Sequence, residues 1–214
     1  MSNTQLKSEK AYQEIKQAII AGQLESGKIY SITELSETFR IGRTPAREAL
    51  VVLASEGLID PIPRSGYQVK PISIQDLLEI FHLRKVLEVE SAGLAAKKIT
   101  AEGILLLEEN NRQEQEIASV LESNISPASY QKGFNLNLEF HLTLARSSGN
   151  QRLAELVEDL LTELERFLVH DPYLAEPQQH FEIIKKLKQR DKPGAEEAML
   201  SHLEDTKDRT LSRL

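Results

Sequence analysis

Cysteine and tryptophan are absent from this 214-residue sequence, and aromatic residues make up only 5% of it. Without cysteine the chain can form no disulfide, no thiol nucleophile and no Cys-ligated zinc site. Its N-terminus has no apolar segment of the signal-peptide kind, and no apolar run approaches the roughly 18 residues of a membrane span. These absences predict a soluble, cytoplasmic protein with no membrane partner. Abundant Leu, Ile, Ala and Glu favour a mostly helical fold.

Acidic residues are unevenly distributed along the chain. Residues 1–72 contain nine basic and eight acidic side chains, whereas residues 73–214 contain 17 basic and 25 acidic ones. The formal net charge of −7 therefore belongs to the second part. A near-neutral first part can still bind a polyanion if its arginines share one face, because affinity follows local charge. The asymmetry indicates two domains, 1–72 and 73–214, with separate tasks.

The first domain has the pattern of a winged helix-turn-helix. Ser31, with Glu34 three residues later, forms a capping box that begins a first short helix. After an Ile-Gly turn, Pro45 lies in the first turn of a second helix, where its missing N–H costs nothing. Two short strands, 58–62 and 67–69, flank a Pro-Arg-Ser-Gly turn and indicate a wing-like hairpin.

Three arginines lie at and just before the start of the second helix, and no acidic residue occurs between Glu37 and Glu48. A helix in the DNA major groove uses its N-terminal side chains against base edges, with neighbouring basic groups on phosphates. Arg64, at the tip of the wing, could reach the backbone or the minor groove. The alternative is an ordinary solvated helix face. The context favours sequence-specific DNA binding, with these candidate contact residues: Thr33, Arg40, Arg43, Thr44, Arg47, Arg64 and Gly66.

From Pro71 onward the pattern is helical throughout. Breaks at Pro, Gly and Asn separate about six helices with short connections, which is typical of an antiparallel bundle. The expected fold is therefore mostly α, a winged helix-turn-helix followed by an all-α bundle. The helices expected from periodicity span residues 11–21, 32–39, 75–98, 100–121, 130–147, 151–169, 177–190 and 193–214.

Five histidines form a second group of candidate functional residues, and four of them lie beyond residue 140. Each of these four lies on a predicted helix or at its end, and facing helices of a bundle can build a His-rich metal site. The intervals between them match no short metal motif, so spacing alone favours ordinary polar or hydrogen-bonded core histidines. The five are His82, His141, His170, His180 and His202.

Two parts of the chain resemble known protein families. The runs IGRTPAREAL, LASEGLI and PRSGYQV, within residues 10–70, resemble the winged helix of the GntR family of transcription regulators. The runs LRKVLEVESAGLAA, LEFHLTLARSSGN, QHF and AMLSHL resemble the FCD type of ligand-binding domain found in the FadR subgroup. Together the two resemblances cover nearly the whole chain.

The resemblance implies a homodimer that binds double-stranded operator DNA and responds to a small carboxylate effector held in the bundle. It also implies a divalent metal, often zinc, with nickel or another transition metal as alternatives, on one Asp and three His. The histidines match His141, His180 and His202, but Asn137 stands where the family has Asp. An amide oxygen is neutral and a weaker ligand than a carboxylate, so we expect metal binding that is retained but weakened.

Arg84 matches an arginine that points into the ligand pocket in this subgroup. Its guanidinium fork suits bidentate capture of a carboxylate, whereas the alternative is an i, i+4 surface pair with Glu88. Gly42 stands where the family often has a serine that caps the reading helix. This loss costs roughly a few tenths of a kcal/mol, so DNA binding should survive it.

The expected function is that of a sequence-specific transcriptional regulator, acting as a repressor, and not that of an enzyme. One alternative is a metal-free sensor of the same family with a larger ligand, such as an acyl thioester. Another is a metalloenzyme in which the three-His site activates water with the help of Glu139. Glu139 lies two residues from His141, roughly 160° away around a helix, so its side chain should point away from the metal.

Overall fold

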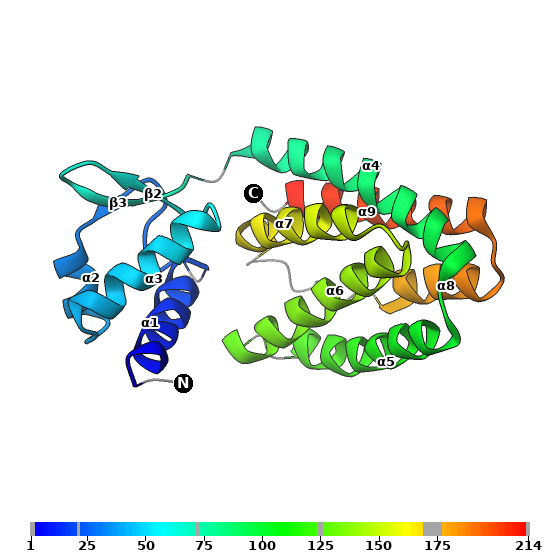
Figure 1. Cartoon of the computed structure of the whole chain (residues 1–214), viewed down its shortest axis with the longest axis horizontal. Coiled ribbons are helices and arrows are strands. Elements are labelled where there is room, and N and C mark those ends of the chain that lie inside the picture. The colour runs from blue at the N-terminus through cyan, green and yellow to red at the C-terminus, as the bar shows by residue number, and fades with distance from the viewer. Residues whose placement is uncertain (1–2, 21, 72, 124–125, 169–176, 213–214) are drawn as a thin grey trace. The chain divides into compact units, whose positions relative to one another are not determined.

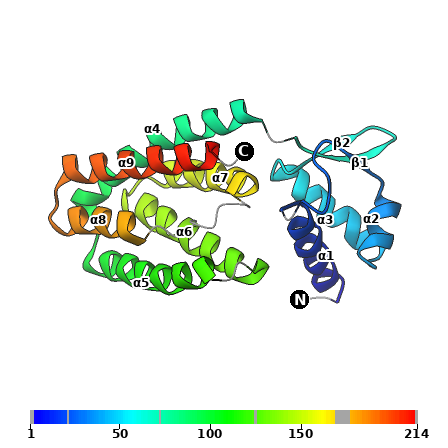
Figure 2. The same cartoon turned by 180° about the vertical axis from the view of Figure 1, so that it is seen from behind.

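A computed structural model of the chain describes residues 3–20, 22–71, 73–123, 126–168 and 177–212. Its contacts divide the chain into two compact units, Met1–Ser73 and Ile74–Leu214, each with its own core. The first unit combines helices with a small sheet, and the second is a group of long helices. Figure 1 shows both units, and Figure 2 shows them from behind. The expected class, a mostly α chain with a winged helix-turn-helix followed by a helical bundle, is confirmed.

The first unit is built from three helices and three strands among the described residues. They are α1 (Asn3–Ile20), β1 (Ile29–Tyr30), α2 (Ile32–Thr38), α3 (Arg43–Ser55), β2 (Ile59–Ile62) and β3 (Gly66–Val69). The sheet is antiparallel in the order β1-β3-β2, with Tyr30 opposite Tyr67 and Ile59 opposite Val69. Strand β1 has only two residues, so it carries no alternation that a sequence reading can detect.

Helix α1 begins at Asn3, earlier than the predicted start at residue 11. Its buried apolar side chains are Ala11, Ile15 and Ala18, which lie three and four residues apart. Periodicity locates only the part of a helix that packs against the core. The predicted start was therefore wrong because the preceding segment, NTQLKSEK, is too polar to show a buried stripe.

Local sequence signals set the ends of the two helices that form the helix-turn-helix. The capping box expected at α2 is present, because Oγ of Ser31 accepts from the N–H of Glu34 at 3.1 Å and Oε2 of Glu34 accepts from the N–H of Ser31 at 3.2 Å. Gly57 follows α3 with a φ of +71°, a left-handed conformation that glycine adopts without strain. Leu35 of α2 and Leu50 of α3 are buried in one core with α1 and the sheet.

The second unit consists of six helices among the described residues. They are α4 (Ile74–Lys98), α5 (Ala101–Ser123), α6 (Pro127–Ser147), α7 (Gln151–Leu168), α8 (Pro177–Lys188) and α9 (Lys192–Leu211). Helix α4 packs against α6, α7, α8 and α9, and α5 packs against α6 and α8. The main core lies where α6, α8 and α9 meet α4, with Phe140, Ile183 and Met199 fully buried. This junction positions the site described below.

The predicted helix ends differ from the observed ones by a few residues. Helix α6 begins at Pro127, where 130 was predicted, because Oγ of Ser126 caps it by accepting from the N–H of Ser129 at 3.1 Å. His170 and the predicted break after it at Asp171 lie outside the described residues. No helix in the described ranges is long and apolar enough to cross a membrane.

The wing tolerates no side chain at Gly66. This residue has a φ of +138°, and an added Cβ would lie 2.3 Å from the carbonyl oxygen of Tyr30. Gly66→Ala should separate β3 from β1 and destabilise the first unit by about 2–4 kcal/mol, measured by urea unfolding with circular dichroism. Gly22→Ala is the control, because Gly22 also has positive φ but no atom lies within 4 Å of its added Cβ. Equal destabilisation by both substitutions would contradict the steric argument.

Candidate functional site

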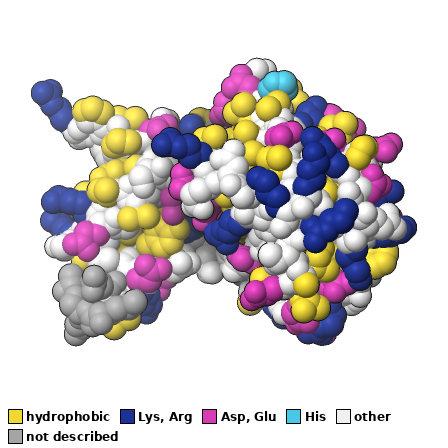
Figure 3. Space-filling model, turned by 45° about the vertical axis from the view of Figure 1, so that its right-hand side comes forward, with side chains coloured by type: hydrophobic (Ala, Val, Ile, Leu, Met, Phe, Trp, Pro, Cys, Tyr) yellow, Lys and Arg dark blue, Asp and Glu magenta, His cyan; other side chains and the backbone are white. Residues whose placement is uncertain are grey.

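The arginines predicted to contact DNA are exposed on the first unit. Arg43 and Arg47 lie on the first two turns of α3, with Thr44 exposed between them. Arg40 lies in the turn before α3, and Arg64 lies at the tip of the β2–β3 hairpin. Within the described part of the chain none of these arginines forms an ion pair. Figure 3 shows basic side chains projecting from the surface of this unit, where their charge is available to phosphates and base edges.

Two of these arginines have a left-handed backbone. Arg40 has a φ of +52° and Arg64 a φ of +65°. This conformation costs a residue with a Cβ about 1–2 kcal/mol, so the surrounding turn must enforce it. Beside Arg64, the N–H of Ser65 donates to the carbonyl of Ile62 at 3.1 Å. Strain of this kind gathers at functional positions, and both residues are predicted contacts.

The other two predicted contacts are less exposed than the arginines. Thr33 is half-buried in the first turn of α2. Gly66 is half-buried and lies against the backbone of Tyr30, so the wing requires glycine there whether or not DNA is bound. A role for either residue in DNA contact stays a prediction.

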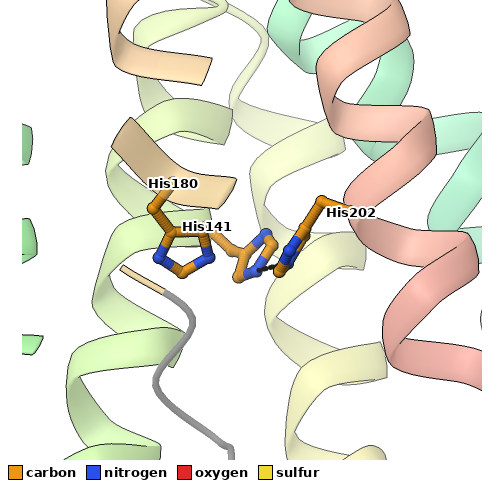
Figure 4. Close-up of side chains that lie close together, drawn as sticks. All are labelled: His141, His180 and His202. Atoms are coloured by element: carbon orange, nitrogen blue, oxygen red, sulfur yellow. Dashed lines mark hydrogen bonds between the residues drawn. The ribbon is translucent and has the colours of Figure 1, made fainter. Parts of the chain in front are cut away.

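Three histidines from three helices meet in the core of the second unit. His141 comes from α6, His180 from α8 and His202 from α9, and Figure 4 shows their rings turned toward one another. The ring centroids lie 4.7–5.3 Å apart, and each residue is at most 2% exposed. Phe140 stacks on His180 with centroids 3.7 Å apart. The structure thus brings together three of the four predicted metal ligands.

Two of these histidines are held through Nδ1 by buried carboxylates. Nδ1 of His141 is in close contact with Oε2 of Glu88 on α4, and Nδ1 of His180 lies 2.6 Å from Oε2 of Glu114 on α5. A carboxylate can only accept a hydrogen bond, so Nδ1 of each ring carries the proton. The other ring nitrogen, Nε2, then keeps a lone pair that can bind a cation.

The third histidine is held in the same way by an amide. Nδ1 of His202 lies 2.7 Å from Oε1 of Gln179, whose Nε2 donates to Oδ2 of Asp205 at 2.9 Å. The bond to Asp205 sets the orientation of the amide, so an oxygen faces the ring and Nδ1 of His202 carries the proton. All three histidines therefore present Nε2 as the available ligand atom.

The Nε2 atoms fit a divalent transition metal. Those of His141 and His202 lie 3.2 Å apart, and Nε2 of His180 is buried without a hydrogen-bond partner among the described residues. Two bare lone pairs this close repel each other, and a cation between them removes the repulsion. Nitrogen ligands of a tetrahedral zinc, each about 2.0–2.1 Å from the ion, lie roughly 3.3 Å apart. One ligand atom from each of the three residues lies within 4.8 Å of the others.

The sequence also makes predictions for two further residues of α6, Asn137 and Glu139. Asn137, the fourth predicted ligand, is half-buried one turn before His141, and its coordination of a metal stays a prediction. Glu139 has a side chain that is 59% exposed and lies 3.6 Å from Nη1 of Arg146. It points away from the histidines, as the helix geometry predicts.

Arg84 is buried, so the alternative of a surface pair with Glu88 was wrong about location. Nε of Arg84 lies 2.5 Å from Oε1 of Glu88, and both residues are 1% exposed. Burial raises the pKa of Glu88, but Arg84 and His141 together outweigh it and hold that pKa at about 2. Nη2 of Arg84 has no hydrogen-bond partner in the described part of the chain. Arg84 therefore pairs with Glu88 through Nε and keeps a second donor, Nη2, that is available to an anion.

The acceptors around the histidines were not predicted as site residues. The sequence predicts Glu88 only as the alternative partner of Arg84, four residues away. Gln179 had a local signal in the sequence, because it is adjacent to His180 in the QHF run. Glu114 had none, because nothing local separates it from the other acidic residues of α5.

A winged helix-turn-helix belongs to a class of DNA-binding folds. The sequence pattern described as the FCD domain matches residues 79–205, and that described as bacterial regulatory proteins of the gntR family matches residues 7–69. The chain belongs to the GntR family of transcription regulators and carries an FCD domain. Its relatives are regulators and not enzymes, so the metalloenzyme alternative is set aside.

The similar proteins support the same assignment. The HTH-type transcriptional repressor RspR of Escherichia coli strain K12 is 29% identical over 211 residues, which cover 96% of this chain and 89% of that protein. The Uxu operon regulator of Haemophilus influenzae is 31% identical over 215 residues, with 90% and 77% covered. The solved structure of E. coli McbR/YncC has a TM-score of 0.74 at 21% identity, over 100% of this chain and 99% of that one, and shows that the fold is shared.

Burial of the histidines makes the stability of the metal-free protein depend on pH. Burial lowers the pKa of His141, against the opposing effect of Glu88. Burial and the neighbouring His180 and His141 bring the pKa of His202 well below its ordinary value. The unfolded chain binds protons at these positions below about pH 6.5, whereas the folded chain binds them only at lower pH. The stabilising contribution is thus fully present above that pH and is lost as the pH falls toward the folded pKa values.

We predict that the free energy of unfolding falls below about pH 6.5, by up to roughly 1.4 kcal/mol per pH unit for each histidine. Urea unfolding of metal-free protein between about pH 5 and 7.5 measures it, a window above the range where Glu88 protonates in the unfolded chain. His202→Asn should reduce the slope, and His82→Asn, at an exposed position, should leave it unchanged. A flat profile in the wild type would contradict the prediction.

Proposed function

We propose that the protein is a homodimeric repressor whose affinity for a palindromic operator is controlled by a small carboxylate bound beside a divalent metal. RspR, similar over most of both chains, is named a repressor. The observation that carries the proposal is a buried core in which Nε2 of His180 and Nη2 of Arg84 both lack hydrogen-bond partners among the described residues. Buried polar groups are normally satisfied, so buried groups of this kind without partners favour a bound ligand.

The DNA-reading part of the proposal rests on the start of α3. Arg43 and Thr44 lie at its N-terminal end, where a helix in the major groove contacts bases. Arg47, one turn later, and Arg40 suit phosphates, and Arg64 suits the backbone or the minor groove. Two such helices in successive major grooves need two-fold symmetry, which supports a homodimer on a palindromic site.

The ligand-binding part rests on charge. His141, His180 and His202 would hold the metal, zinc with nickel or another transition metal as alternatives, and Asn137 is the fourth candidate ligand. A metal held by neutral ligands keeps its double positive charge and would supply a Lewis acid to an incoming anion. Arg84 would hold the same anion through Nη2, because its guanidinium fork suits a carboxylate.

The two parts must be coupled through the packing of the helices. Arg84 lies on α4 and the histidines lie on α6, α8 and α9. An acid that bridges them would change how α4 packs against the other three, and with it the spacing of the two reading helices in the dimer. Only a ligand with different affinities for the two arrangements can shift operator binding in this way.

Arg43→Ala should abolish sequence-specific operator binding, because each lost base contact costs about 1–3 kcal/mol and a dimer loses two. The duplex is selected from a random-sequence library with the wild type, and affinity is measured by fluorescence anisotropy at fixed salt. Arg152→Ala, at an exposed position of α7, is the control and should bind as the wild type does. If Arg43→Ala, folded by circular dichroism, bound the operator unchanged, the residue would have no reading role.

Protein purified without chelators should contain about one metal ion per chain by elemental analysis, as expected for one set of ligands. His141→Ala should lose it and should gain no thermal stability from added zinc, because binding to the folded state is what stabilises. His82→Ala, which changes an exposed histidine, should keep the metal. A wild type that holds no metal even after incubation with zinc would refute this site.

A further inference from the structure

Glu88 contacts both halves of the buried site. Its Oε1 accepts from Nε of Arg84 at 2.5 Å, and its Oε2 is in close charge–dipole contact with Nδ1 of His141. All three residues are at most 1% exposed, so water screens neither contact. One carboxylate therefore joins the arginine proposed for the effector to a histidine proposed for the metal.

We propose that Glu88 sets the affinities for the metal and for the anion in opposite directions. Its charge strengthens metal binding through His141 and weakens anion binding at Arg84. The inference rests on the proposed function, because it concerns the metal and the carboxylate that this function requires. It adds a positioning residue that neither ligand has to touch.

On the metal side, the contact of Glu88 with Nδ1 fixes the tautomer and the orientation of His141. Nε2 of His141 is then directed at His202, and the Nε2 atoms of the two residues lie 3.2 Å apart. A carboxylate partner also makes the imidazole a stronger donor, and loss of such a partner lowers metal affinity roughly 10–100-fold. Because Asn137 supplies no charge, the negative charge nearest to the metal would come from the carboxylates behind the histidines.

On the anion side, Glu88 already uses part of the guanidinium. Nε of Arg84 is bonded to it, and Nη2 is a buried donor without a partner among the described residues. A second carboxylate at Nη2 would meet a cation that is already paired, together with the repulsion of the charge on Glu88. Between like charges a few ångströms apart in a buried site, this repulsion lowers affinity by about tenfold or more.

Glu114 offers a matched comparison within the same core. Its Oε2 lies 2.6 Å from Nδ1 of His180, and it is fully buried. Among the described residues it forms no ion pair with an arginine or a lysine. Glu114→Gln thus removes the same charge from the same kind of histidine as Glu88→Gln does, and leaves Arg84 as it is.

The test measures two affinities in the full chain of the wild type, Glu88→Gln and Glu114→Gln. Zinc affinity is measured by competition with a chromophoric chelator, and acetate affinity by thermal shift after the metal has been removed. Both variants should bind zinc about 10–100-fold more weakly than the wild type. Acetate should bind Glu88→Gln about tenfold more tightly than the wild type, and Glu114→Gln with unchanged affinity.

The outcomes separate this inference from the proposed function. A wild type that binds no zinc overturns both. If the wild type binds zinc, two results for Glu88→Gln overturn the inference alone. One is a zinc affinity equal to that of the wild type. The other is an acetate affinity that is unchanged, lower or undetectable. A gain in acetate affinity of equal size in Glu114→Gln also overturns it, because the effect would then not depend on contact with Arg84.

Loss of its partner leaves Arg84 as an unpaired buried cation, which can prevent Glu88→Gln from folding. The double variant Arg84→Met with Glu88→Gln removes that charge, and it should keep the weaker zinc binding and show no gain for acetate. Wild-type zinc affinity in the double variant would overturn the proposal. Proton–nitrogen NMR of the zinc-bound wild type should show His141 protonated at Nδ1 and coordinated through Nε2, and coordination through Nδ1 would overturn it as well.

Discussion

A carboxylate buried between an arginine and a histidine constrains the whole helical unit. Glu88 remains charged in the core because Arg84 and His141 both contact it, and breaking such a buried pair costs about 3–5 kcal/mol. Helix α4 must therefore keep its position against α6, which carries His141. Helices α8 and α9 supply the other two histidines, and both pack against α4, so four helices meet around the centre.

The two units use charge in contrasting ways. In the first unit the arginines are exposed and form no ion pair within the described residues, so their charge remains available to a polyanion. In the second unit the charged groups at the centre are buried and paired, and the histidines stay neutral, so what remains available is a set of lone pairs and one guanidinium donor. A net charge of −7 on a DNA-binding protein is consistent with this division of tasks.

Sequence patterns predicted the elements more closely than the contacts between them. The capping box of Ser31 was predicted because a cap acts within one turn, whereas β1 depends on pairing with β3, far along the chain. The metal candidates His141, His180 and His202 came from resemblance, since their spacing alone favoured ordinary core histidines. The alternative interpretation of Arg84, a pair with Glu88, was expected on the surface, but the pair lies in the core, because burial of α4 depends on its neighbours.

The sequence by itself determined the order and type of the helices, the start of the capped helix α2, and which chemical groups are available. Caps, prolines, glycines and apolar spacing act over a few residues, and composition alone excludes thiol chemistry. Only the tertiary structure decided that Glu88, Glu114 and Gln179 each hold one Nδ1, and that the three Nε2 atoms turn inward. These acceptors lie on α4, α5 and α8, and the distance between packed helices is set by the whole core and not by any local pattern.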